Sequence, residues 1–92
     1  MKDYYAVLGI ASDAPLAEIR QAYRRSAQQY HPDRNRSPEA PERFRDVQEA
    51  YETLSDVRRR HDYDENRRRN LLEKPLETAQ EIWNHYLAGV LS

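Results

Sequence analysis

Apolar side chains recur at spacings of three and four residues in two adjacent stretches of the chain. This spacing predicts helices over about residues 15–31 and 41–55, because it places the apolar side chains along one side of a helix. The two apolar stripes are Ile19, Ala22, Tyr23, Ala27 and Tyr30, and then Phe44, Val47, Ala50, Tyr51 and Leu54. Pro32 ends the first helix and a polar loop follows, so we expect an antiparallel helical hairpin.

Three further helices are expected around this hairpin, which makes the predicted fold all-α. Asp3 and Gly9 favour the start and the stop of a short helix over about residues 3–8. Residues 57–66 are polar on nearly every side and predict a short fourth helix. An amphipathic helix over about residues 75–90 has an apolar stripe of Leu76, Ala79, Ile82, Trp83, Tyr86, Leu87, Val90 and Leu91. Its apolar face needs a partner. The residues expected in the core include Tyr4, Tyr5, Phe44, Tyr51 and Leu54.

Composition narrows the class of protein. The chain has 92 residues, enough for one small domain with an appended element. It contains no cysteine, which excludes disulfides and thiolate metal sites. No apolar run approaches the roughly 18 residues of a membrane-spanning helix, and no signal-peptide pattern opens the chain. We therefore expect a cytoplasmic protein without a membrane partner.

The net charge of −1 hides an uneven distribution along the hairpin. The helix expected at residues 15–31 carries Arg20, Arg24 and Arg25 away from its apolar stripe, against the single acid Glu18. The helix expected at residues 41–55 is acidic instead. Complementary charges can flank the seam between them, although the apolar stripes matter more for stability because surface ion pairs contribute little.

The sequence YHPDRN at residues 30–35 places a histidine and an aspartate around the proline that ends the first hairpin helix. As a catalytic pair, His31 and Asp33 lack a nucleophile and an oxyanion-hole motif. As a metal site, they supply two ligands where three or four are needed. We therefore predict no enzyme, no metal and no other cofactor. Local features alone indicate a helix stop, but a stiff tip beside a cationic helix also offers a docking surface for an acidic partner.

Four sequence blocks, taken in order, carry a family resemblance. They read DYYAVLGI, EIRQAYRRSAQQYHPDRN, FRDVQEAYETLSD and RRRHDYD. Over about residues 2–66 the chain resembles the J-domain of DnaJ-like co-chaperones. The resemblance implies a J-domain over residues 1–68 and a helical extension over residues 69–92. No Gly/Phe-rich linker, cysteine-rich zinc region or β-rich client-binding domain follows in this sequence. If the chain is complete, the J-domain-only type is expected; the alternative is a piece of a longer protein.

The resemblance also implies a function. J-domains dock onto ATPase chaperones of the DnaK heat-shock class and stimulate their ATP hydrolysis, which locks client polypeptide into the chaperone. The chaperone-binding residues implied for this chain are His31, Pro32, Asp33 and Asn35 in the loop, Arg20, Tyr23, Arg24 and Arg25 before it, and Arg59 and Arg60 in the fourth helix. In the family, loss of the aspartate abolishes stimulation, which places most weight on Asp33. Tyr23 also belongs to the apolar stripe, so a packing role is at least equally expected.

Ser26 departs from the family's pattern, which usually has leucine at this place on the apolar stripe. Losing a buried leucine-sized group costs roughly 2–5 kcal/mol when the site cannot collapse. We hypothesise that the helix over residues 75–90 covers the domain here, with Trp83 or Leu87 filling the space.

Two other functions stay open. A small helical nucleic-acid-binding protein could use the arginine runs at residues 58–60 and 67–69, although nearby acids weaken phosphate affinity and no nucleic acid is expected. The second alternative is a J-like interaction module that has lost ATPase stimulation. The helix over residues 75–90 could bind a client or another partner protein, and we expect a monomer or a weak dimer.

Overall fold

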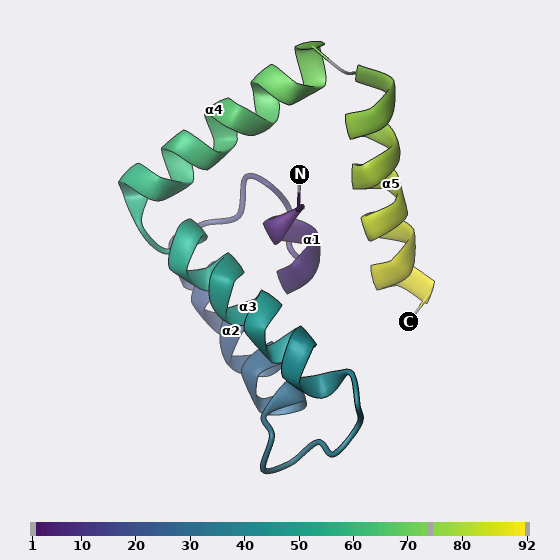
Figure 1. Ribbon diagram of the computed structural model, residues 1–92. Helices are drawn as coiled ribbons and strands as arrows, with labels where there is room; N and C mark the ends of the chain where they lie inside the picture. Colours follow the sequence, from purple (N-terminus) through teal and green to yellow (C-terminus); the bar gives the residue numbers. More distant parts are fainter. Residues whose placement is uncertain (1, 74, 92) are drawn as a thin grey trace.

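The computed structural model describes residues 2–73 and 75–91, apart from the side chains of residues 75–79 and 90–91. All regular structure in these ranges is helical, which confirms the predicted all-α class. The helices are α1 (Tyr4–Leu8), α2 (Leu16–Tyr30), α3 (Ala40–Leu54), α4 (Val57–Glu73) and α5 (Pro75–Leu91) (Figure 1). None of the helices in the described ranges is both long and apolar enough to cross a lipid bilayer.

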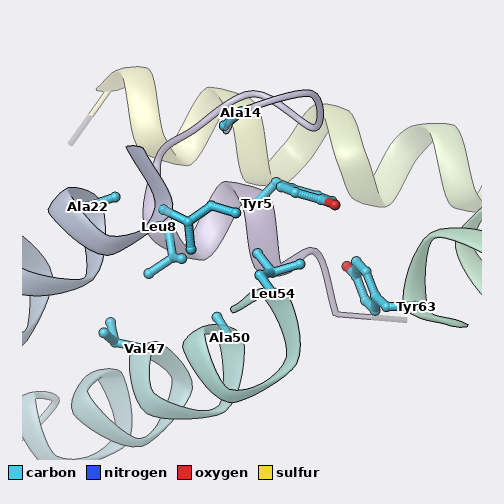
Figure 2. Packing of buried hydrophobic residues seen from close by; sticks show 9 residues of the cluster. Tyr5, Leu8, Ala14, Ala22, Val47, Ala50, Leu54 and Tyr63 are labelled. Atoms are coloured by element: carbon cyan, nitrogen blue, oxygen red, sulfur yellow. The ribbon is translucent and has the colours of Figure 1, made fainter. Parts of the chain in front are cut away.

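Helices α2 and α3 lie side by side and supply much of the core (Figures 1 and 2). The apolar stripes predicted for them face each other, so their central side chains lose nearly all contact with water. The most deeply buried are Ile19, Ala22, Val47, Ala50 and Leu54, each at most 2% exposed. Truncating a side chain such as Leu54 to alanine in this setting costs about 2–5 kcal/mol. The hairpin is therefore held chiefly by these apolar contacts.

The short helix α1 is closed at both ends by specific hydrogen bonds. Asp3 Oδ1 accepts from two backbone N–H groups of the first turn, at 3.1 and 3.2 Å. A third N–H group, that of Tyr4, donates to the hydroxyl of Tyr63 in α4 at 3.0 Å. At the other end, Gly9 has the left-handed φ of 69° that glycine adopts without strain, and its N–H donates back to α1. These contacts hold a helix of five residues that would not be stable alone.

Polar contacts also join α1 to α3. The Tyr4 hydroxyl donates to Glu49 Oε1 at 2.6 Å, and the Lys2 ammonium donates to Asp46 at 2.8 Å and to Glu49 at 3.3 Å. The hydrogen bond from Tyr4, helped by Lys2, holds the pKa of Glu49 below its ordinary value. These groups are largely exposed, so the contacts contribute little to stability. Burial of the Tyr5 side chain, which is 2% exposed, does more to fix α1 in place.

Helix α4 is longer than expected, because it continues past the predicted end near residue 66 to Glu73. The arginines at residues 67–69 and the leucines that follow are good helix formers, so nothing in the sequence stops the helix earlier. The predicted division between residues 1–68 and 69–92 therefore falls inside a continuous helix, and it remains a prediction.

Helix α5 contacts α1 and α4, and its axis runs in a different direction from that of α4 (Figure 1). The expectation that Trp83 fills the space at Ser26 is wrong, because Trp83 is 58% exposed and stacks on the equally exposed Tyr86. The α5 residues opposite Ser26 are His85, Ala88 and Gly89, and Trp83 lies about 200° around the helix from His85. Leu87 is half-buried but does not line this space. The side chains of Leu76, Ala79, Val90 and Leu91 lie outside the described residues.

Candidate functional site

The loop between α2 and α3 carries the His-Pro-Asp tripeptide and is shaped by His31. Because a residue before proline is forced out of helical backbone, α2 ends at Tyr30 and His31 has φ −62° and ψ 133°. The His31 carbonyl accepts from the N–H groups of Arg34 and Asn35, both at 2.9 Å. Its ring Nδ1 accepts from the N–H of Asp33 at 3.2 Å. One residue therefore organises the turn through both its backbone and its ring.

Asn35 ties the loop back to the end of α2. Its Nδ2 donates to the carbonyl of Gln29 at 3.0 Å, and its Oδ1 accepts from the N–H of Ser37 at 2.9 Å. An asparagine can do both because its amide holds a donor and an acceptor. The side chain thus links three points of the chain and limits the movement of the tripeptide between them.

Phe44 of α3 supports the loop from the other side. Its ring meets the His31 imidazole edge to face, with 5.4 Å between centroids and 75° between the ring planes. The expectation that Phe44 belongs to the core is therefore only partly right, since it is half-buried and lies outside the buried cluster. Its position one turn into α3 brings it to the loop instead of the hairpin centre.

Asp33 presents its carboxylate to solvent. The Asp33 side chain is 89% exposed, and its Oδ2 lies 3.7 Å from His31 Nδ1. Pro32 beside it is exposed as well. A carboxylate on a stiff turn is well suited to a charge-assisted hydrogen bond from an arginine of another protein.

The arginines of α2 form an exposed cationic surface that leads towards this loop. Arg20, Arg24 and Arg25 are all exposed, and none forms an ion pair with another described residue. Arg20 and Arg24 lie one turn apart on the same side of the helix, whereas Arg25 lies about 100° further round. Tyr23 points inwards, and its ring stacks on Tyr51 at 4.1 Å with 17° between planes. Tyr23 therefore has a packing role in the hairpin.

Arg60 is bound within the protein. Its Nε donates to the Tyr5 hydroxyl at 3.1 Å, and its Nη2 donates to the carbonyls of Ser12 and Ala14 at 3.1 and 2.8 Å. These contacts fasten the segment before α2 to α4. Arg59 differs, because its side chain is exposed and only its backbone N–H is held, by Asp56 at 3.0 Å. Of the two predicted arginines, the structure leaves Arg59 available to another molecule.

One side of α4 has a structural role that sequence analysis missed. The Arg67 guanidinium pairs with the buried Asp3 at 3.3 Å and lies 5.2 Å from the centre of the Tyr5 ring. The Tyr5 hydroxyl donates to Asp64 at 2.6 Å. Burial raises the pKa of Tyr63 to about 12, and its hydroxyl donates to the Lys2 carbonyl at 2.7 Å. The sequence feature that could have indicated this packed side of α4 is the helical spacing of four residues, Arg60, Tyr63, Asp64 and Arg67.

The geometry of the loop fits the binding of another molecule better than it fits a catalytic or metal site. The His31–Asp33 pair has no nucleophile in the turn, and both side chains face solvent instead of a closed pocket. Within the part of the chain that the structure describes, no three His, Asp or Glu side chains are grouped to hold a metal ion. What the arrangement offers is an exposed carboxylate at the tip of the hairpin and an exposed cationic surface along α2.

A family model described as the DnaJ domain matches residues 3–64. This segment contains α1, α2, α3, the connecting loop and the first part of α4.

Several curated proteins are similar to the chain over the same region. Chaperone protein DnaJ 2 of Thermus thermophilus is 56% identical over 63 residues, which cover 68% of this chain and 22% of that protein. DnaJ homolog subfamily B member 9 of Rattus norvegicus is 49% identical over 63 residues, covering 68% of this chain and 28% of that protein. Chaperone protein DnaJ of Hydrogenobacter thermophilus is 41% identical over 90 residues, covering 90% of this chain and 25% of that protein. The chain thus spans about a quarter of the length of these relatives.

Proposed function

The chain belongs to the DnaJ domain family, and on this premise we propose that it acts as a co-chaperone. It docks on an ATPase chaperone of the DnaK heat-shock class through α2 and the loop that follows. Docking stimulates ATP hydrolysis by that chaperone and so aids the folding or delivery of a client polypeptide. The observation that carries this proposal is the exposed Asp33 carboxylate on a loop held at both ends.

The loop supplies the specific part of the contact. Asp33 accepts a charge-assisted hydrogen bond from the chaperone, and His31 supports it from the base of the turn. Pro32 restricts the loop before docking, so less conformational entropy is lost when the chaperone binds it. Asn35 keeps the loop in the shape that presents Asp33 outwards.

The arginines supply the long-range attraction. Arg20, Arg24 and Arg25 are exposed cations that steer the chain onto an acidic surface of the chaperone. Arg59 is a further exposed cation for the same contact. Tyr23 and Arg60 act through the fold, because Tyr23 packs on α3 and Arg60 fastens α4 to the segment before α2.

In this proposal the chain is not an enzyme, and the ATP is bound and hydrolysed by the partner. A cytoplasmic location, binding of a client or partner through α5 and a monomeric or weakly dimeric state all remain predictions from the sequence.

The nucleic-acid alternative is weakened by the internal contacts of α4. Arg60 and Arg67 belong to the two arginine runs on which that alternative relied, yet their guanidinium groups face α1. Filter binding to duplex DNA over a salt series tests it. Weak binding with the same salt dependence after Arg58→Ala argues against a specific phosphate contact.

The test of the proposal is steady-state ATP hydrolysis by a DnaK-type chaperone with and without this chain. Wild type is expected to stimulate hydrolysis, and Asp33→Asn is expected to remove the stimulation. A matched control is Asp62→Asn, because Asp62 is another exposed aspartate beside a histidine, with 3.8 Å between His61 Nδ1 and Asp62 Oδ1. Stimulation that survives Asp33→Asn would refute the mechanism. No stimulation by wild type would favour a J-like module that has lost this activity.

A further inference from the structure

Two large aromatic side chains lie exposed on α5, and the proposed function does not use them. Trp83 and Tyr86 are each 58% exposed, and their rings stack with 5.8 Å between centroids and 24° between planes. Enclosing such a side chain is favourable, because each one buries roughly 150–250 Å² when it is fully covered. A stacked aromatic pair left in water therefore indicates a surface to which another molecule binds.

The exposed pair belongs to a regular apolar stripe of α5. In the sequence, apolar residues stand at positions 76, 79, 83, 86 and 90, so the spacing alternates between three and four residues. This is the heptad spacing at which helices pack side by side in coiled coils. It extends over most of α5 (Pro75–Leu91). We call these five positions the outer stripe, and its described side chains include Trp83 and Tyr86.

The protein packs against a different side of α5. Among the described residues, α5 contacts only α1 and α4, and both lie on the same side of it (Figure 1). His85 is half-buried with its Nδ1 closed to solvent, and it lies about 200° around the helix from Trp83. Ala88 and Gly89 line the space towards the hairpin. Trp83 and Tyr86 therefore point away from the rest of the chain, and a partner reaches them without displacing α5.

The charges on α5 favour a second copy of the chain as this partner. Residues 75–91 contain two acids, Glu77 and Glu81, and the helical repeat places both positions about 120–160° around the helix from Trp83. The positions beside the outer stripe are uncharged. They are Gln80, Ile82, Leu87 and Gly89. Two such stripes meet without like-charge repulsion, because the positions that flank the contact carry no charge.

Other partners match α5 less well. A charged partner helix is selected by complementary charges beside the contact, and the flanking positions of α5 offer none. An anionic lipid surface attracts helices with Lys or Arg on their polar side, whereas residues 75–91 contain neither. The next charged residues along the chain, Glu73 and Lys74, come before the first turn of α5.

The exposed area fits a weak association of two copies. Since Trp83 and Tyr86 are each 58% exposed, these side chains of two copies can together bury about 350–600 Å² more. The residues beside them add to this area, and the contact falls among the small interfaces below about 1,200 Å². Interfaces of this size are typical of transient complexes, so we expect a dissociation constant in the micromolar range.

We propose that the outer stripe of α5 binds the outer stripe of a second copy, so that two chains form a symmetric dimer. In a two-fold dimer both partners contribute the same surface, and an uncharged apolar stripe is complementary to itself. The Trp83 and Tyr86 rings of one copy pack against those of the other.

Such a dimer leaves the proposed docking surface uncovered. Among the described residues α5 does not pack on α2, which carries Arg20, Arg24 and Arg25. One dimer therefore presents two His-Pro-Asp loops. The inference goes beyond the proposed function and does not depend on it, since Asp33→Asn should remove ATPase stimulation and leave dimerisation unchanged.

The experiment measures self-association of the full chain by sedimentation equilibrium over about 1–500 μM, a range that brackets a micromolar dissociation constant. Trp83 is the one tryptophan of the chain, so its fluorescence reports on this surface. We expect monomer to convert to dimer as concentration rises. The Trp83 emission should shift to the blue over the same range, because its ring leaves water. Both signals come from wild type and need no substitution.

Trp83→Glu and Asn84→Glu form a matched pair. Both introduce the same charge at neighbouring exposed positions of α5, but position 84 lies about 100° around the helix from Trp83 and outside the outer stripe. Trp83→Glu is expected to weaken dimerisation by about tenfold or more, because it removes an aromatic contact and brings like charges together. Asn84→Glu should leave the dissociation constant unchanged. Thermal melts at a concentration at which wild type is monomeric should be alike for all three proteins.

Four results would overturn the inference. The first is a chain that stays monomeric at the highest concentration. The second is a dimer whose formation leaves the Trp83 emission unchanged, because the contact would then lie on another surface. The third is equal weakening of dimerisation by Trp83→Glu and Asn84→Glu. The fourth is a blue shift of Trp83 when vesicles of phosphatidylglycerol and phosphatidylcholine are added to a monomeric chain, which would assign the outer stripe to lipid.

Discussion

Single residues decide how the loop presents Asp33. His31 binds the turn through its carbonyl and its Nδ1, and Asn35 connects the loop with the end of α2. These bonds do not use the Asp33 carboxylate, and among the described residues only the His31 ring lies close to it. The loop is thus ordered by its neighbours while its charged group stays available. We therefore predict that one substitution can disturb the shape of the loop without removing the Asp33 charge, and that another can remove this charge without disturbing the shape.

Asn35→Ala tests the shape of the loop alone. The change removes two hydrogen bonds at the surface and leaves every charge in place. Each of these bonds stabilises the folded shape of the loop by about 1 kcal/mol. We expect ATPase stimulation at sub-saturating concentration to fall by about threefold to tenfold. The melting temperature should change little, because the core is untouched. Asn84→Ala is the control at an exposed site, and equal loss of stimulation in both variants would contradict the role of Asn35.

Tyr63 makes stability sensitive to alkaline pH. Burial raises its pKa to about 12, so the folded protein favours the protonated phenol more strongly than the unfolded chain does. This contribution to stability is complete below the ordinary tyrosine pKa of about 10 and is lost as the pH rises from about 10 to about 12.

Urea unfolding at pH 8 and pH 11 checks this prediction. Tyr63→Phe should be less stable than wild type at pH 8 by about 1–3 kcal/mol, because the Tyr4 N–H and the Lys2 carbonyl lose a partner. The variant should then lose less additional stability at pH 11. Equal losses in both proteins would show that Tyr63 does not titrate in this range.

Among the helices, α4 is notable because it is rich in charged residues and yet holds the short helix α1 in position. Four residues of α4 follow one another at helical spacing and contact α1, its N-cap Asp3 or the segment after it. They are Arg60, Tyr63, Asp64 and Arg67. The other side of α4 is exposed to water. This arrangement fixes α1 against the hairpin, and the hairpin carries the loop.

Arg67 and Arg68 are neighbours in α4, but the first forms a partly buried ion pair and the second an exposed one. Substituting each of them compares the contributions of the two ion pairs to stability. Arg67→Ala leaves the buried Asp3 carboxylate without its ion pair, and we expect a loss of about 1–3 kcal/mol in unfolding free energy. Arg68→Ala removes only an exposed contact with Glu65 at 3.7 Å, so the change should stay within about 0.5 kcal/mol. Denaturant unfolding measures both. Equal effects would mean that Arg67 does not anchor α1.

The hairpin could be predicted from sequence because its apolar stripes are local and periodic, as Ile19, Ala22, Val47 and Leu54 show. The roles of Arg60 and Arg67 could not, since spacing alone does not say which side of a polar helix packs. Phe44 and Trp83 also differ from expectation. Hydrophobicity predicts burial in general, whereas helix orientation decides whether a given aromatic ring faces the core, the loop or water.

At the scale of the whole molecule, the loop lies at one end of an elongated body of 41 × 27 × 18 Å (Figure 1). The last turn of α4 and the first turn of α5 lie at the opposite end (Figure 1). The cationic residues of α2 run along the body towards the loop, although the chain as a whole has a net charge of −1. A local cationic surface on a nearly neutral molecule favours one docking orientation over non-specific association.

This charge distribution predicts a salt-sensitive association. Raising ionic strength from 0.05 to 0.5 M should slow association with a DnaK-type chaperone, because screening shortens the Debye length to a few ångströms, from roughly 14 to 4 Å. Arg24→Ala should slow association at low salt and have little effect at high salt. Stopped-flow fluorescence measures both rates, with Arg69→Ala on the exposed side of α4 as control. An association rate independent of salt would argue against electrostatic steering by α2.

The most direct test of the central claim is the rate of a single turnover of ATP on a DnaK-type chaperone, measured over a concentration series of this chain. Wild type and Asp62→Asn are expected to reach the same maximal rate, well above the unstimulated one. Asp33→Asn is expected to stay at the unstimulated rate even at concentrations that saturate binding. A maximal rate for Asp33→Asn equal to that of wild type, reached only at higher concentration, would contradict the account, because Asp33 would then serve affinity alone.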